Sequence, residues 1–293
     1  MAACFGNNEA PATNTAAPKT VFPEIHASMA KIEPFFERMG KPAAYDWLAS
    51  HNEPGQTFDE YVDADPVKPT KERNKIYVLP LGSFTQRQKK VIDTTTGYLE
   101  MFYGLPIRRL PSQIFRRPLS VKNSRRNPST GSEQIRTGYI LDDILKRTIP
   151  NDAAALIAFT SDDLYPDASM NYVFGQSSLA DRVGVWSLSR LDANANYDTF
   201  LRRTIKIATH ETGHMFSMRH CIKYECVMSG ANYLGETDRR PVDACPECSA
   251  KVWWLTGAVP SERYQKLADF CRRNGLAKEA DEFSRKAAAV KSP

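Results

Sequence analysis

A short stretch in the C-terminal third of the sequence contains residues that could hold a metal ion and activate water. It reads His210-Glu-Thr-Gly-His214-Met-Phe-Ser-Met-Arg-His220. On a helix, residues four apart lie one turn apart on the same face, so His210 and His214 can share one ion. Glu211 lies beside this pair without being a ligand, which is where the base for a zinc-activated water is needed. The spacing therefore predicts a zinc site with an adjacent catalytic carboxylate.

The third histidine strengthens the zinc interpretation. His220 comes six residues after His214 and cannot lie on the same helical face, so the helix must end near Ser217 and the chain must turn back toward the ion. Three nitrogen ligands and one open position form the zinc geometry that enzymes use for catalysis. The alternative is a group of core histidines held by hydrogen bonds. It is the weaker reading, because three of the chain's five histidines fall in this stretch.

Four cysteines that follow at once indicate a second metal site. In order, separated by four, 18 and two residues, they are Cys221, Cys226, Cys245 and Cys248. This spacing suits a closed tetrahedral thiolate site, which is structural because no position is left for water or substrate. Cys4 and Cys271 have no partner at ligand spacing. We therefore expect two zinc ions per chain, one catalytic and one structural.

Composition and charge limit the class of protein. An apolar content of 42% and a charged content of 25% are ordinary for a globular protein. No run of 18 apolar residues exists, so no membrane span is expected. The start lacks the basic and apolar regions of a secretory signal, which predicts an intracellular protein, cytoplasmic or nuclear. Clustered cysteines agree, since such a chain favours metal thiolates over disulfides.

One basic stretch raises the question of nucleic acid. Pro106–Arg126 carries seven Lys and Arg residues and no acidic residue. Aromatic side chains for base stacking are not interleaved there, because Phe115 is the one aromatic residue in it. The net charge of +5 is also mild. We read this stretch as a solvated loop, and the sequence argues against a nucleic-acid partner.

Strands alternating with helices must position the metal sites. Strands are expected at KIYVLPLG, AAALIAFT, NYVFGQ and VGVWSLSRL, and helices at Thr85–Tyr103, Tyr139–Thr148, Ser261–Asn274 and Ala277–Val290. A helix capped by Asp198 and running to about Phe216 carries the first two histidines. Residues from Cys221 to about Val252 have loop character. This alternation indicates an α/β layer arrangement.

The metal-site residues and their surroundings resemble the archaemetzincins, intracellular metalloproteases of the metzincin clan. The resemblance is carried by YVFGQSSLADRVGVWSLSR, TDRRP, WLASHNEPGQTFDEYV, the three histidines, Glu211, the four clustered cysteines and Met228. It covers about Trp47–Arg263. It implies a zinc-dependent peptidase that acts on peptides or proteins, with a metzincin-like zincin fold, α/β or α+β, whose mixed twisted sheet carries an active-site helix. It also implies that Met228 forms the Met-turn, whose thioether packs under the catalytic zinc; by itself Met228 reads equally as a core methionine.

The resemblance and the pattern along the chain together predict four segments. They are a disordered tail (1–22), an extension of loop and short helices (23–70), an upper catalytic subdomain (71–217) and a lower subdomain with the Met-turn, the four-cysteine site and the terminal helices (218–293). In this clan an extended substrate pairs with the edge strand of the sheet. The candidate edges are Asn171–Gln176, which we favour, and Gly184–Ser189.

Two positions depart from the pattern of the clan. Ser217 stands where metzincins usually have glycine, and a left-handed backbone there would cost about 1 kcal/mol. Gly230 stands where some metzincins have a tyrosine that steadies the oxyanion, and nearby Tyr233 has no assigned role.

Two other classes of function compete with the peptidase. One is a catalytically weak zinc-binding protein for peptide recognition or regulation, whose enzyme site has decayed. The intact Glu211 argues against it, because zinc binding does not require that carboxylate. The other is a nucleic-acid-binding zinc protein, which rests only on the cysteine spacing and on Pro106–Arg126.

Overall fold

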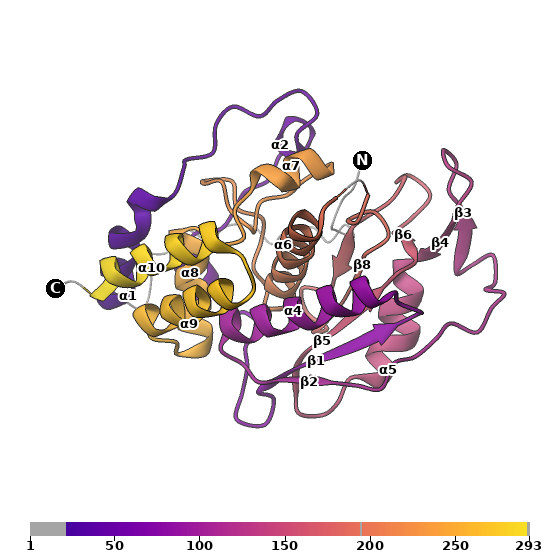
Figure 1. Ribbon diagram of the computed structural model, residues 1–293, viewed down its shortest axis with the longest axis horizontal. Helices are drawn as coiled ribbons and strands as arrows, with labels where there is room; N and C mark the ends of the chain where they lie inside the picture. The colour runs from indigo at the N-terminus through magenta and orange to yellow at the C-terminus, as the bar shows by residue number, and fades with distance from the viewer. Residues whose placement is uncertain (1–21, 194, 292–293) are drawn as a thin grey trace.

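The computed structural model describes residues 22–193 and 195–291, which form two β-sheets and their covering helices (Figure 1). The expected tail and Cys4 lie outside these residues, apart from Phe22. The larger sheet has the strand order β2-β1-β5-β8-β7 and the smaller one β3-β4-β6. The bounds are β1 (Lys75–Leu81), β2 (Ile107–Arg109), β3 (Ser124–Arg126), β4 (Glu133–Arg136), β5 (Ala153–Thr160), β6 (Asp163–Tyr165), β7 (Gly175–Ser177) and β8 (Val183–Ser187). Both sheets mix parallel and antiparallel pairs, which confirms the predicted fold class.

Helices cover the larger sheet and extend beyond it on one side. Their bounds are α1 (Pro23–Ile32), η1 (Glu33–Phe35), α2 (Trp47–Ser50), α3 (Phe58–Asp63), α4 (Gln86–Tyr103), η2 (Tyr139–Leu145), α5 (Lys146–Thr148), α6 (Tyr197–Met215), α7 (Leu234–Arg239), α8 (Pro246–Thr256), α9 (Pro260–Arg273) and α10 (Ala277–Lys291). Among the described residues, none of these helices has the length and apolar character needed to cross a membrane.

The central strand β5 is buried along its whole length. Its alternate side chains enter two separate cores. Ala155, Ile157 and Phe159 belong to the core beneath α4 and α6, whereas Leu156 and Ala158 belong to the core beneath η2. A strand covered on both faces needs a continuous apolar run rather than an alternating one, and AAALIAFT supplies it.

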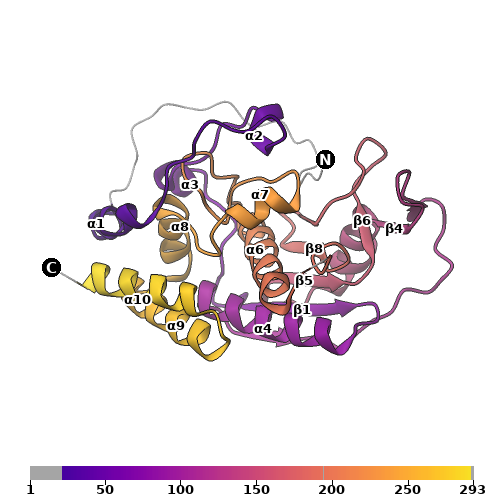
Figure 2. The same cartoon turned by 45° about the horizontal axis from the view of Figure 1, so that its top comes forward.

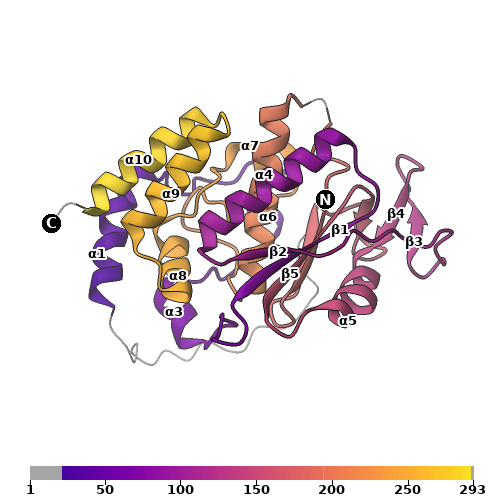
Figure 3. The ribbon, with the colours of Figure 1, turned by 60° about the horizontal axis from the view of Figure 1, so that its bottom comes forward.

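Helices α4 and α6 pack against each other, and α4 also contacts α9 (Figure 3). A capping box at Thr85 begins α4, and Gly104, with a φ of 64°, ends it. Asn196 begins α6, because its side chain accepts a hydrogen bond from the Thr199 amide at 2.8 Å. The prediction that Asp198 caps this helix is wrong. Asp198 lies in the first turn, where the helix dipole still favours a negative charge.

Strand β7 forms the free edge of the larger sheet and pairs antiparallel with β8 on its inner side. The favoured edge candidate, Asn171–Gln176, overlaps this strand at its end. The other candidate, Gly184–Ser189, is wrong, because β8 lies between β5 and β7 with partners on both sides.

Helices at the two ends of the chain lie together, away from the small sheet. Helices α9 and α10 form a hairpin, and α1 packs on α8 and α10. The predicted ends of both terminal helices agree with the structure to within one residue. A buried ion pair of 2.9 Å joins Lys286 on α10 to Asp243, in the segment between α7 and α8. The short helix α2 lies beside α7 (Figure 2).

Candidate metal centres

Helix α6 carries two of the three histidines, and both are buried. His210 Nδ1 lies 2.9 Å from the carbonyl oxygen of Val227, and His214 Nδ1 lies 2.6 Å from that of Met218. A carbonyl oxygen only accepts hydrogen bonds, so each Nδ1 must carry the ring proton. Each Nε2 is then the atom with a lone pair for a metal.

The turn after α6 brings the third histidine to the same place. Ser217 has a φ of 61°, so the left-handed backbone expected at the usual glycine position is present. Its hydroxyl donates to the Leu179 carbonyl at 3.0 Å and accepts from the Val67 amide at 3.1 Å. These two hydrogen bonds stabilise a serine in a backbone conformation that otherwise favours glycine.

The three Nε2 atoms converge as ligands of one zinc ion would. They are 2.9 Å apart between His210 and His214, and 3.2 Å apart between His210 and His220. Nitrogens around a tetrahedral zinc would be about 3.3 Å apart, given zinc–nitrogen distances of about 2.0–2.1 Å. Burial lowers the pKa of His210 to about 3 and that of His214 well below its usual value, which keeps both rings neutral. Neutral imidazole is the state that binds zinc, so the donor set fits the ion.

Glu211 is fully buried beneath the edge strand β7. The hydroxyl of Ser177 donates to its Oε2 at 2.5 Å. A Cβ on Gly175 would lie 3.0 Å from its Oε1, so a larger residue there would press on the carboxylate. The edge strand therefore fixes the carboxylate beside the histidines. Sequence reasoning did not identify Ser177, because it lies 34 residues before Glu211 in a segment read only as a strand and loop.

Met228 packs against the active-site helix. A Cβ on Gly213 would lie 2.5 Å from the Met228 sulfur, so only glycine allows the thioether to approach the helix this closely. Gly213 directly precedes His214. The thioether thus lies against the part of the helix that carries the histidines.

The N-terminal extension also reaches this centre. Glu53 places its carboxylate oxygens 2.7 and 2.9 Å from Nδ1 of His220. Burial is the largest single influence and raises the pKa of Glu53, but hydrogen bonds and nearby positive charge, first among them the bond with His220, together outweigh burial and the net shift is downward. Glu53 lies in WLASHNEPGQTFDEYV, one of the segments that carry the resemblance, but nothing in the sequence gave this residue a role.

A tryptophan from the same extension fills the space beside Gly230. The Trp47 ring stacks on His51 at 3.6 Å and meets His220 edge to face at 5.3 Å. A Cβ on Gly230 would lie 2.5 Å from the indole, so the tyrosine of other metzincins has no room here. Tyr233 is occupied elsewhere, since its hydroxyl donates to Asp46 at 2.9 Å.

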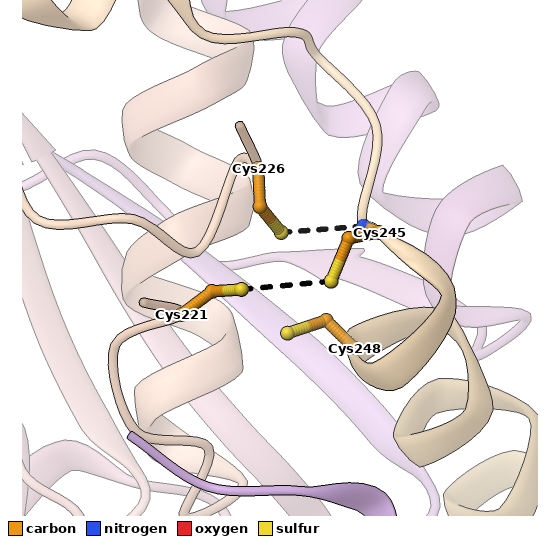
Figure 4. Close-up of side chains that lie close together, drawn as sticks. All are labelled: Cys221, Cys226, Cys245 and Cys248. Carbon is orange, nitrogen blue, oxygen red and sulfur yellow. Dashed lines mark hydrogen bonds between the residues drawn. The ribbon is translucent and has the colours of Figure 1, made fainter. Parts of the chain in front are cut away.

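The four cysteines form a second buried group (Figure 4). Their sulfur atoms lie within 4.8 Å of one another, and those of Cys221 and Cys245 are 3.6 Å apart. None of the four forms a disulfide. Around a tetrahedral zinc, sulfurs would be about 3.8 Å apart, given zinc–sulfur distances of about 2.3 Å. The geometry and donor type fit a closed zinc site.

Local structure favours thiolates at this second group. Cys245 and Cys248 lie at the N-terminus of α8, where the helix dipole stabilises negative charge. The Cys226 sulfur accepts from the amides of Cys245 and Met228, at 3.2 and 3.4 Å. Hydrogen bonds from the neighbouring thiols lower the pKa of Cys221, whereas burial raises the pKa of Cys226 and Cys245. A cation among the sulfurs would offset that burial cost.

One main-chain segment connects the two groups. The Cys221 amide donates to the Met228 carbonyl at 2.9 Å, while the preceding residue, Val227, accepts from His210. Cys221 is also the residue after His220. The cysteine loop is therefore connected to two of the histidines, to His220 by a peptide bond and to His210 by a hydrogen bond.

The basic stretch Pro106–Arg126 has partners within the chain. Arg109 pairs with Asp93, and Arg117 pairs with Glu133 and Asp162. Arg125 donates to the main-chain carbonyls of Met170 and Asn171. Several basic side chains of this stretch therefore form contacts within the protein.

Comparisons with known proteins agree on one family. A model described as peptidase family M54 matches residues 135–253. The chain is 35% identical over 260 residues to archaemetzincin-2 of Homo sapiens, covering 76% of this chain and 71% of that protein. It is 29% identical to archaemetzincin-1 of Mus musculus, and the match covers 78% of this chain and 52% of that protein. A crystal structure of an archaemetzincin from Methanopyrus kandleri matches with a TM-score of 0.53 at 24% identity. The match covers 65% of this chain and 99% of that one, which supports the fold.

Proposed function

The chain belongs to the archaemetzincins and is a zinc metallopeptidase, and on that premise we propose that it cleaves peptide bonds at the histidine site with Glu211 as general base. The observation that carries the proposal is the fully buried Glu211 carboxylate, held by Ser177 next to three converging imidazole nitrogens. Zinc binding alone does not require a carboxylate in this place.

The metal ligands are proposed from the donor geometry. His210, His214 and His220 would hold a catalytic zinc ion, with Met228 as the Met-turn. A structural zinc ion would be held by Cys221, Cys226, Cys245 and Cys248. This makes two zinc ions per chain, and only the first would retain a position open to solvent and substrate.

The chemistry divides between the ion and the side chains. Zinc at the three nitrogens supplies a Lewis acid that polarises a carbonyl group and lowers the pKa of water. Glu211 takes the proton from the attacking water and later passes a proton to the departing amine. Ser177 holds Oε2 of that carboxylate and so fixes its direction. No side-chain nucleophile is needed, and no covalent intermediate forms.

The substrate would lie along the edge of the larger sheet. Strand β7 is an edge strand, and its residues Gly175 and Ser177 lie over Glu211. An extended peptide that adds to this edge would bring its scissile bond near the histidines. We divide the molecule accordingly, with residues 71–217 above the substrate, residues 218–293 below it, and residues 23–70 as an extension.

We place the protein in a reducing compartment, cytoplasmic or nuclear. The support is the cysteine chemistry, since the four clustered cysteines and Cys271 are all buried thiols without disulfides. Clustered free thiols of this kind are typical of proteins kept under reducing conditions.

A diverse peptide library tests the function directly. Incubation with purified protein, with and without a chelator, should give cleaved products by mass spectrometry only in the untreated sample. Trimmed ends would indicate an exopeptidase and internal cuts an endopeptidase. Peptides that bind without being cleaved would favour the alternative, a zinc-binding recognition protein. Elemental analysis of the same preparation should give close to two zinc ions per chain, and a firm value of one would remove one of the two proposed sites.

A further inference from the structure

The Nδ1 atom of His220 has a partner unlike those of the other two metal-site histidines. His210 and His214 face neutral main-chain carbonyls, whereas His220 faces the carboxylate of Glu53 at 2.7 and 2.9 Å. The two side chains are only 2% and 17% exposed. Water and salt therefore screen this contact weakly.

We propose that Glu53 is a positioning residue of the metal centre, which fixes the direction of the His220 ring and strengthens its Nε2 atom as a ligand. A carboxylate that accepts the Nδ1 proton sets the tautomer of a ligating histidine and makes its other nitrogen more basic. The inference rests on the proposed function, because it takes His220 to be a zinc ligand.

The chain after Glu53 is fixed onto the residues on both sides of His220 and onto α8. The Gln56 side chain accepts a hydrogen bond from the Arg219 amide at 3.1 Å, and the main-chain carbonyl of Gln56 accepts one from the Lys251 ammonium at 2.7 Å. Gly55 has a φ of 68°, and a Cβ there would lie 2.7 Å from a carbon of Ile222. This close approach leaves Glu53 little freedom to move away from the histidine.

The chain before Glu53 is anchored just as firmly. The Trp47 amide donates to both oxygens of Glu236, at 3.0 and 3.1 Å, and Glu236 is fully buried. The same tryptophan lies edge to face on His220. With anchors on both sides, the carboxylate is held beside the histidine, and an anchored partner needs little further ordering when a metal binds.

Zinc affinity of the full-length protein tests the inference. In competition with a chelator, Glu53→Ala should weaken the labile zinc site by about 10- to 100-fold. Glu53→Gln should weaken it less, because an amide oxygen still accepts the Nδ1 proton but carries no charge. The tightly held zinc at the cysteines should be unaffected in both variants.

Cobalt(II) substitution gives a second measurement that does not depend on activity. The visible absorption of cobalt at the nitrogen site reports its ligand geometry, and both Glu53 variants should change it. The sulfur-to-cobalt charge-transfer absorption of the cysteine site should stay the same.

Two reference variants make the outcome decisive. Glu60→Gln makes the same chemical change in the same extension, but the Glu60 carboxylate accepts from the Thr57 amide at 2.8 Å, so the zinc affinity of this variant should equal that of the wild type. His220→Ala must weaken the labile site, and an unchanged affinity there would overturn the histidine site itself. If His220→Ala weakens it and Glu53→Ala does not, the positioning role alone is overturned. An equal loss in Glu60→Gln and Glu53→Gln would also overturn it, since the folding of the extension would then explain the effect.

Discussion

The peptide bond between His220 and Cys221 links the histidine site to the cysteine site, yet the residues that form the two sites come from very different distances along the sequence. The cysteine site is local, since its four sulfurs and the two amides that donate to one of them lie between residues 221 and 248. The histidine site takes partners from much farther away, including Glu53, 167 residues before His220. The proposed structural site is thus specified by short spacing, whereas the proposed catalytic site depends on distant parts of the fold.

The largest expected effect separates chemistry from metal binding at the histidine site. Glu211→Gln should lower peptide hydrolysis on the order of 10²- to 10⁴-fold, because the shape is kept and only the proton acceptor is lost. Both zinc ions should remain, as measured by elemental analysis. Near-wild-type turnover in a preparation free of contaminating protease would reject Glu211 as the base.

The next prediction concerns the coupling between the two sites, which should run mostly one way. Cys248→Ser should weaken the cysteine site, loosen the segment from Cys221 to Met228, and weaken zinc binding by the histidines by about tenfold. His210→Ala should leave the cysteine site intact, because four thiolates can still fold their own loop around zinc. Zinc titrations of both variants against a chelator measure this asymmetry. Unchanged histidine-site affinity in Cys248→Ser would make the cysteine site a local clamp only.

A smaller effect is expected from the edge strand that supports Glu211. Ser177→Ala removes a hydrogen bond to a buried carboxylate and should lower kcat by about tenfold, with little change in KM or zinc content. The matched control is Ser178→Ala, because the Ser178 hydroxyl donates instead to the exposed Asp181 at 2.8 Å. Steady-state kinetics on one peptide should separate the two variants. Equal kcat values for both would remove the role assigned to Ser177.

The smallest effect concerns the turn between the second and third histidines. Ser217→Gly relieves about 1 kcal/mol of left-handed strain but loses two hydrogen bonds of about 0.5–1.5 kcal/mol each. The net change in stability should therefore lie between zero and a loss of about 2 kcal/mol. Ser217→Ala keeps the strain and loses the same bonds, so it should melt at a lower temperature than Ser217→Gly. Thermal melts at fixed zinc concentration compare them, and an alanine variant as stable as the glycine variant would show that the turn is unstrained.

Short-range patterns in the sequence predicted much of the molecule. The spacing of His210, His214 and His220 predicted that their nitrogens would meet, and they do. The cysteine spacing likewise predicted the grouping of four sulfurs. Apolar periodicity gave β5 and α9 because a buried strand and an amphipathic helix leave different patterns.

What the sequence did not predict depends on contacts between distant residues. Glu53 and Ser177 reach the site only through the folding of the extension and the sheet, and neither has a local signature. The region 221–252 was expected to be loop, but it contains α7, and α8 begins at Pro246. That helix is buried on nearly every side, so its apolar residues show no one-sided period. The small sheet was also missed, since its strands are short and β3 lies in the stretch read as a basic loop.

The separation of 167 residues between Glu53 and His220 also has a consequence for the order of folding. Contacts between residues far apart in the chain form late, because the long loop between them must first be closed. The cysteine group closes a much shorter loop and can capture its ion before the rest of the molecule is complete. Refolding in cobalt(II) should then show sulfur-to-cobalt absorption before the absorption of the nitrogen site. A chain in that intermediate state would already contain one metal but would hold the ion at the histidines more weakly, so the metal centre would reach its full affinity only after the N-terminal segment has folded back onto it.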